Sequence, residues 1–158
     1  WAFTDSHYIL FANRVRLDLT GSLMAMSGYS PMISALSVNP SKPTSPVYLL
    51  PRFSNCKRNW SVPIEVPEQL WLLHVGNAFE RKDDVGNFEI QIHASACSYG
   101  WFNFEKMFGY DWQNGKLDPS FMNRKEGEKK GLPQLVKVSI ELDANGNGQK
   151  SSVEPLCQ

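Results

Sequence analysis

The residues best suited to bind a metal in this chain of 158 residues are its three histidines, His7, His74 and His93. His74 lies within LWLLHVGNAFE, residues 70–80, in the middle of an apolar run. An imidazole in such surroundings needs a backbone, carboxylate, water or metal partner, because an unpaired buried polar group is costly. The three histidines show neither H-x-H nor H-x-x-x-H spacing. The residues alone therefore favour a hydrogen-bonded core histidine, with metal binding through distant segments as the alternative.

A second motif could bind calcium. The segment DANGNGQKSSVE matches the D-x-[DN]-x-[DN]-G-x5-E loop, with oxygen ligands at Asp143, Asn145, Asn147 and Glu154. Such a loop needs a helix on each side, whereas here an alternating, strand-like run precedes it and Pro155 follows its last ligand. Asn-Gly pairs are also typical of hairpin turns, because they tolerate positive φ. The sequence favours a hairpin over a calcium site.

The segments that must position these residues are mostly strand-like. Runs rich in β-branched and aromatic residues, bounded by turn residues, cover 7–19, 45–53, 68–75, 87–96 and 133–143. The last run alternates apolar and polar residues with the period of two that indicates a half-exposed antiparallel strand. We therefore predict an all-β chain built as a sandwich, barrel or propeller. Short helical insertions are expected in Ser22–Leu36, with a break near Pro31, and around Trp101–Phe108.

The strand that carries His74 is expected to be short. Pro67 and Gly76 bracket it, so the strand should end near His74. With a period of two, His74 shares one face with Leu70 and Leu72. The histidine would then close an apolar face, next to a turn.

The composition excludes some partners. Lysine plus arginine and aspartate plus glutamate each total 16, so no net charge would attract nucleic acid. The three cysteines are widely spaced and odd in number, which favours a reducing compartment. No apolar run approaches the roughly 18 residues of a membrane-spanning helix. The chain starts at Trp1 without Met, and we expect it to be a fragment.

The run LHVGNAFE is similar to the F-H-x-x-N-A-[YW]-E signature of the carotenoid cleavage oxygenases, and the opening WAFT resembles the tail of their H-D-[FW]-A-x-T signature. The two occur in the family's order and at about its separation. Leu73 and Arg81 depart from the pattern, which often has Phe and a second Glu there. Plant members that serve strigolactone biosynthesis closely resemble further segments: SPMISAL, VYLLPRF, EVPEQLWLLHVGNAFE, ASACSYGWFNFEKMFGYDWQNGKLDPS, LVKVSIELD and VEPL. The resemblance covers essentially the whole chain.

This resemblance implies a seven-bladed β-propeller that holds Fe(2+) on its axis through four histidines, with second-shell glutamates behind some of them. Residues 1–158 would be an internal fragment with several blades, inactive and aggregation-prone by itself. His74 would be one iron ligand. The histidine of the other signature would sit two positions before Trp1, and the other ligands, the second-shell glutamates and the remaining site residues would also lie outside the fragment. We assign no chemical step to Asn77 or Glu80, which we expect to close the turn after the strand; His7 and His93 match no family ligand and are interpreted as structural.

The resemblance also implies a reaction. O2 would cleave the 9',10' double bond of 9-cis-β-carotene, giving 9-cis-β-apo-10'-carotenal and β-ionone, in a plastid whose isomerase supplies the cis-carotene. The transit peptide would lie outside this fragment. Ser22–Leu36 and Trp101–Trp112 are candidates for substrate-tunnel or peripheral membrane contact, with ordinary core or lid packing as the alternative. A non-catalytic β-sheet interaction domain and the calcium loop remain as other functions.

Overall fold

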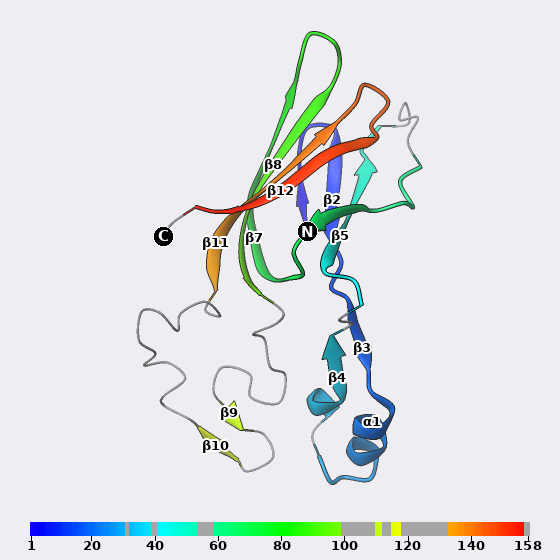
Figure 1. The fold of residues 1–158 in the computed structure, drawn as a ribbon, viewed down its shortest axis with the longest axis vertical. Helices are drawn as coiled ribbons and strands as arrows, with labels where there is room; N and C mark the ends of the chain where they lie inside the picture. The colour runs from blue at the N-terminus through cyan, green and yellow to red at the C-terminus, as the bar shows by residue number, and fades with distance from the viewer. Residues whose placement is uncertain are drawn as a thin grey trace. The chain divides into compact units, whose positions relative to one another are not determined.

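The computed structural model describes residues 1–30, 32–38, 41–53, 59–98, 110–111, 115–117 and 133–156 (Figure 1). The chain divides into two compact units. The first comprises Trp1–Asn13, Pro43–Cys97 and Pro133–Gln158, and the second comprises Arg14–Lys42 and Ser98–Leu132. His7, His74 and His93 all belong to the first unit. Among the described residues, no helix is long and apolar enough to cross a membrane.

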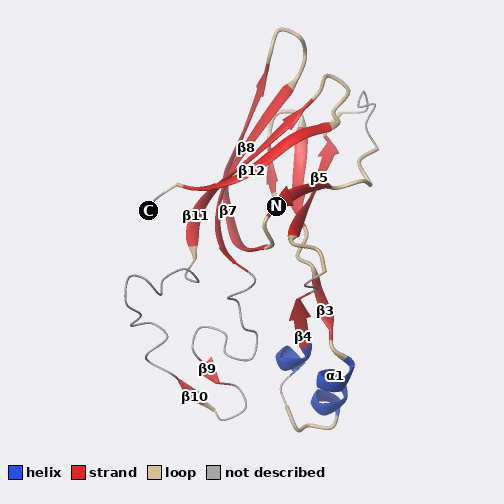
Figure 2. Ribbon diagram, viewed as in Figure 1, coloured by secondary structure: helices blue, strands red, loops and turns tan. Residues whose placement is uncertain are grey.

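The first unit contains two four-stranded antiparallel sheets (Figure 2). One has the order β1-β2-β5-β6, with β1 Ala2–Phe3, β2 His7–Phe11, β5 Thr44–Pro51 and β6 Ile64–Pro67. In this sheet Ile9 pairs with Leu49 and is buried, while Tyr8 and Leu10 on the opposite face are exposed. One face therefore supplies core residues, as alternation with a period of two requires.

The second sheet has the order β12-β11-β8-β7, with β7 Leu70–Lys82, β8 Phe88–Ser98, β11 Gln134–Leu142 and β12 Gly148–Pro155. The alternation predicted for residues 133–143 is confirmed in β11, where Val136, Val138 and Ile140 are buried. In each sheet the strands keep their order along the chain, but β2 is joined to β5, and β8 to β11, through residues of the second unit.

The core of the first unit lies between the two sheets. Buried apolar side chains from both sheets form one cluster, including Ile9 and Leu49 from the first and Ile90, Ile92 and Ile140 from the second. Fully burying each such side chain stabilises the fold by about 1.5–3 kcal/mol. The sheets also meet at their edges, where β1 contacts β7 and β6 contacts β12. Each sheet thus completes the core of the other.

The strand leaving the first sheet enters the second through a tight connection between β6 and β7. Glu68, which follows Pro67, has φ +72°, in the left-handed region that most residues avoid. Buried Ser45 of β5 holds this connection, because its hydroxyl donates to the Glu68 carbonyl at 3.1 Å and accepts from the Leu70 amide at 2.8 Å. The start of β7 is therefore fixed to the first sheet.

The hairpin predicted within Asp143–Glu154 is confirmed, with its turn at residues 143–147 between β11 and β12. Asp143 Oδ1 accepts hydrogen bonds from the Asn145 and Asn147 amides, each at 2.8 Å, and Oδ2 accepts from the Asn147 side chain at 3.1 Å. A strand rather than a helix follows, and within it Glu154 pairs with Lys137 of β11 at 2.9 Å. These ligand positions serve the hairpin and its strands instead.

The β7–β8 hairpin has the same construction, which the sequence analysis missed. Residues 83–87, DDVGN, share the pattern D-x-x-G-N with DANGN at 143–147. Asp83 Oδ1 accepts from the Val85 and Asn87 amides, and Oδ2 accepts from the Asn87 side chain at 2.8 Å. Gly86 takes positive φ, as the glycine of the other hairpin does. The second sheet therefore uses one turn twice.

Two predicted boundaries, the end of the first strand and the start of the first helix, differ in the structure. The run 7–19 is not one strand, because β2 ends at Phe11 and a separate β3, Val15–Leu17, precedes helix α1, Leu19–Met26. Asp18 caps this helix, accepting a hydrogen bond from the Gly21 amide at 2.8 Å, so the helix begins before the predicted Ser22.

The helix α1 of the second unit buries none of its residues, although it is rich in leucine and methionine. The remaining elements of this unit are η1 Met32–Ala35, β4 Leu36–Val38, β9 Tyr110–Asp111 and β10 Lys116–Leu117. Antiparallel pairing joins β3 to β4 and β9 to β10. The helical spacing predicted around Trp101–Phe108 lies outside the described residues.

Candidate functional site

His74 lies within strand β7 and has an exposed side chain. In the part of the chain that the structure describes, β7 pairs only with β8, so His74 occupies an edge strand. No hydrogen bond from a described residue reaches its ring. Leu70, four residues earlier in β7, is buried in the core, and Glu80, six residues later, contacts the first sheet through its carboxylate. The exposed imidazole of His74 between them is available to bind a further group.

The strand does not end at His74 as predicted. β7 continues through Gly76, Asn77 and Glu80 to Lys82, so neither Asn77 nor Glu80 closes a turn after a short strand. Gly76 has a different role, because a Cβ there would lie only 3.3 Å from the carbonyl oxygen of His93 in β8. Glycine inside a strand can mark such a close approach of two backbones.

The substitution Gly76→Ala tests this close approach. We expect it to destabilise the full-length protein by about 1–3 kcal/mol, because the added methyl group meets a backbone oxygen held in the sheet. Thermal unfolding of wild type and variant would measure the change. The matched control is Gly148→Ala, whose Cβ would make ordinary contacts of 3.4–3.6 Å with the flexible Ile64 side chain. Equal losses in both variants would contradict the interpretation of Gly76.

Four polar side chains join the two sheets at the far end of β7, and we call this set the Glu80 clasp. It consists of Glu80 and of Thr4, Ser6 and His7, which lie in the turn between β1 and β2 and at the start of β2. Glu80 Oε2 accepts from Thr4 Oγ1 at 2.6 Å, and Oε1 accepts from Ser6 Oγ at 2.5 Å. His7 Nδ1 lies 3.1 Å from Glu80 Oε2 and 2.8 Å from Ser6 Oγ. Glu80 is therefore the common acceptor of the clasp.

The hydrogen bonds of the clasp indicate where the hydrogen of His7 Nδ1 lies and which form of the Glu80 carboxyl group is favoured. The Ser6 hydroxyl donates its hydrogen to Glu80, so His7 Nδ1 must carry the hydrogen in its own two contacts. Burial, the largest single influence, raises the pKa of the Glu80 carboxyl. Hydrogen bonds from Ser6, Thr4 and His7 and the attraction of His7 together outweigh burial, and the pKa lies below its usual value. The ionised carboxylate is therefore the form that the clasp stabilises.

The clasp is shielded from solvent. The His7 and Glu80 side chains are only 9% and 10% exposed, and Thr4 is buried. The His7 ring packs edge-on against Phe88 of β8, with ring centres 5.9 Å apart. Removing the acceptor would leave buried hydroxyl and imidazole donors without a partner, which is more costly than losing an exposed contact.

The three histidines do not converge. His7 belongs to the clasp, His74 is exposed on the edge strand, and the His93 ring of β8 packs against Phe79 at 5.5 Å. Among the described residues, no group of three or more His, Cys, Asp or Glu side chains could hold a metal ion. Any metal at His74 therefore needs ligands from beyond the described residues, and His74 fits as one neutral nitrogen donor of such a set.

The sequence analysis did not identify the clasp. The available signals were a polar run, TDSH at residues 4–7, where an apolar strand begins, and Glu80 at the end of the signature run LHVGNAFE. These segments are more than 70 residues apart, so only the fold shows that they meet.

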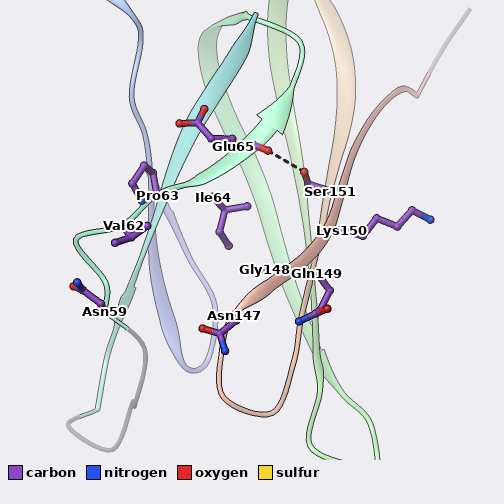
Figure 3. A pocket seen from close by; sticks show the side chains of 10 residues that line it. All are labelled: Asn59, Val62, Pro63, Ile64, Glu65, Asn147, Gly148, Gln149, Lys150 and Ser151. Carbon is purple, nitrogen blue, oxygen red and sulfur yellow. Dashed lines mark hydrogen bonds between the residues drawn. The ribbon is translucent and has the colours of Figure 1, made fainter. Parts of the chain in front are cut away.

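At the opposite edges of the sheets, β6 and β12 border a groove (Figure 3). The Ser151 hydroxyl of β12 donates to the Glu65 carbonyl of β6 at 3.2 Å, and the Ile64 side chain lies against Gly148. In their sheets β6 and β12 are the edge strands opposite to β1 and β7, respectively. The groove is therefore separate from both His74 and the clasp.

Comparison with protein families gives a match over nearly the whole chain. The model of the retinal pigment epithelial membrane protein family matches residues 1–157. The chain belongs to this family. This confirms the resemblance to carotenoid cleavage oxygenases seen in the signature runs around Trp1 and His74.

Two curated members of the retinal pigment epithelial membrane protein family are similar along the chain. It is 62% identical over 160 residues to "Carotenoid cleavage dioxygenase 7, chloroplastic" of Arabidopsis thaliana, and 54% identical over 159 residues to the protein of the same name of Oryza sativa subsp. japonica. Each match covers 99% of this chain and 26% of the relative. The chain thus spans about a quarter of the length of these relatives.

Solved structures establish the fold of the family in this chain. A crystal structure of cobalt-substituted Synechocystis ACO matches 96% of the chain and 26% of its own length, with a TM-score of 0.54 and 18% identity. A trigonal crystal form of a D477G ACO/RPE65 chimera matches 98% of the chain and 26% of its own length, with a TM-score of 0.52 and 15% identity. These are propellers, so the predicted fold class, an all-β propeller fragment with short insertions, is confirmed.

Proposed function

We propose that the full-length protein is a carotenoid cleavage dioxygenase that uses Fe(2+) and O2. The observation that carries this proposal is the 62% identity to a chloroplastic carotenoid cleavage dioxygenase 7 over 99% of the chain. The proposed reaction is cleavage of the 9',10' double bond of 9-cis-β-carotene to 9-cis-β-apo-10'-carotenal and β-ionone, as a step of strigolactone biosynthesis. The proposed location is the plastid, because both curated relatives are described as chloroplastic.

His74 is the proposed iron ligand within this chain. Its exposed imidazole on an edge strand supports the proposal, since a neutral imidazole is a suitable iron ligand. Ferrous iron held by imidazoles would supply the activation of O2 without a haem. Strand β7 would hold His74 in place, because Leu70, four residues earlier, is buried in the core and anchors the strand.

The path of β1 supports a second ligand beside His74. β1 and β7 contact each other and both run upward in the view of Figure 1. Thr4, at the end of β1, binds Glu80 of β7. The histidine proposed two positions before Trp1 would lie five residues before Thr4. An extended backbone would place it level with a point five residues before Glu80, and so beside His74.

Membrane contact is the proposed route for the substrate. A carotene is insoluble in water, so an enzyme that acts on it needs an apolar surface to receive it. Helix α1 supports this role, because Leu19 and Met26 are 75% and 74% exposed and none of its residues is buried. Peripheral contact of this kind needs no membrane-spanning helix.

The reaction is tested with the purified full-length protein, loaded with Fe(2+) and supplied with 9-cis-β-carotene under ¹⁸O2. The expected products are the aldehyde and ketone named above, each with one labelled oxygen, and a ferrous chelator should stop their formation. All-trans-β-carotene serves as the matched substrate. No cleavage of either isomer would overturn the proposal and favour the alternative of a non-catalytic β-sheet interaction domain.

A further inference from the structure

We infer that the face of the first sheet turned away from the second sheet packs against a further β-sheet of the full-length protein. We call it the outer face, and it consists of the β1, β2 and β5 side chains that lie opposite the core: Phe3, Tyr8, Leu10, Tyr48 and Leu50. Tyr8 pairs with Phe3 on one side and with Leu50 on the other, and Leu10 pairs with Tyr48. Directly paired residues point to the same face of a sheet. The inference depends on neither the iron nor the reaction.

Both faces of the first sheet are apolar. β2 reads HYILF and β5 reads TSPVYLLP, so apolar side chains follow one another instead of alternating with polar ones. Near-continuous apolar runs are typical of strands that are covered on both faces, whereas a strand with one wet face alternates. β11 of the second sheet shows the alternating pattern, with Lys137, Ser139 and Glu141 between its buried residues. The composition of the first sheet therefore indicates a layer with protein on both sides.

The outer face is open to solvent in this chain. Phe3, Tyr8 and Leu10 are 56%, 46% and 42% exposed, and beside them Trp1 and Phe53 are 76% and 63% exposed. Trp1 stacks on Phe3, with ring centres 6.3 Å apart. Single exposed apolar residues are ordinary, but a contiguous apolar surface marks a site of interaction.

Arg52 indicates the chemistry of the covering surface. Its guanidinium lies 5.5–6.0 Å from the centres of three aromatic rings, those of Phe3, Tyr8 and Phe53. One of its nitrogens donates to the Thr4 carbonyl at 2.8 Å. Arginine and aromatic residues are enriched where protein surfaces meet, and the remaining N–H groups need acceptors once water is excluded. The covering sheet should therefore be apolar, with a carboxylate or carbonyl oxygen opposite Arg52.

The rest of the full-length protein is the occupant that the comparisons support. The chain spans 26% of the length of its curated relatives and of the propeller in cobalt-substituted Synechocystis ACO, so most of their length lies outside it. A propeller arranges its sheets radially around an axis, so each sheet has a neighbour on either face. The second sheet covers one face of the first sheet, and a neighbouring blade would cover the outer face.

Hydroxyl-radical labelling of the full-length protein, in dilute solution and without lipid, tests this packing. The labelling rate of each side chain is divided by its rate in the denatured protein. Tyr8 and Phe53 should be protected at least roughly fivefold more than Trp60, which is 54% exposed in a turn outside the sheets, because the core of an interface is packed like a protein interior. Labelling of Tyr8 and Phe53 as fast as Trp60 would overturn the inference. Protection that appears only as the protein concentration rises would assign the outer face to a second copy, and would overturn it too.

A pair of lysine substitutions tests the same face through stability. Leu10→Lys places a charge within the outer face and should lower the thermal midpoint of the full-length protein by several degrees, because a covered, unpaired charge is costly. Val85→Lys makes a similar change at the tip of the β7–β8 hairpin, where Val85 is 79% exposed, and should leave the midpoint unchanged. Equal midpoints for wild type and Leu10→Lys would contradict the inference. Labelling needs no substitution, so it gives the answer if Leu10→Lys fails to fold.

Discussion

Replacing His74 with alanine in the full-length protein should abolish carotene cleavage and weaken Fe(2+) binding by more than about 100-fold. Loss of an outer-shell partner alone costs about 10–100-fold in metal affinity, and loss of a direct ligand should cost more. The fold should survive, because the side chain is exposed and no described residue hydrogen-bonds to its ring. Metal analysis of the purified protein and product chromatography would measure the two effects.

His93→Ala is the matched control for this substitution. His93 lies in β8, the strand next to β7, and its ring packs on Phe79 rather than on an open edge. This variant should keep its iron and its activity, with at most a modest loss of stability. If His74→Ala keeps both iron and turnover, His74 is not a ligand, and the proposed site must be built without β7.

Ile140→Ala should lower the free energy of unfolding by about 2–5 kcal/mol, the largest stability effect that we expect from one substitution. Ile140 is fully buried in β11 and pairs with Ile90 of β8 in the core between the two sheets. The substitution removes buried methyl and methylene groups and leaves a cavity that two facing sheets cannot easily close. Chemical denaturation of the full-length protein would measure the change.

Leu135→Ala gives the comparison within the same strand. Leu135 is 47% exposed, so its truncation removes little buried surface and should change the free energy of unfolding by less than about 1 kcal/mol. Similar losses for both variants would mean that the face of β11 toward the first sheet is not the core. The pair therefore tests how the two sheets pack, independently of the metal.

The sequence could predict the parts of the fold that follow from local pattern. β11 alternates buried and exposed residues along its length, and its prediction was correct because a sheet with one dry face imposes that period. The hairpin at Asp143 was predicted from Asn-Gly pairs, and Gly146 of the first pair takes the positive φ that such a turn needs, which is a local property. The signature around His74 marked the family for the same reason, since it is a contiguous run.

The errors arose where a residue's role depends on a distant partner. Gly76 was interpreted as the end of a strand, but its lack of a side chain serves a close approach to His93 of the neighbouring strand. Glu80 was assigned to a turn, although it lies within β7 and binds Thr4 and Ser6. No local pattern distinguishes a glycine or glutamate that meets a neighbouring strand from one that ends its own.

The Glu80 clasp also has a consequence for the order of events during synthesis. Its partners are 73–76 residues apart, so Thr4, Ser6 and His7 leave the ribosome well before Glu80. At about 5–20 residues per second, the wait is roughly 4–15 s. During this interval the first sheet has neither its carboxylate partner nor the second sheet that completes its core. The two sheets can therefore be joined at the clasp only after β7 has been synthesised.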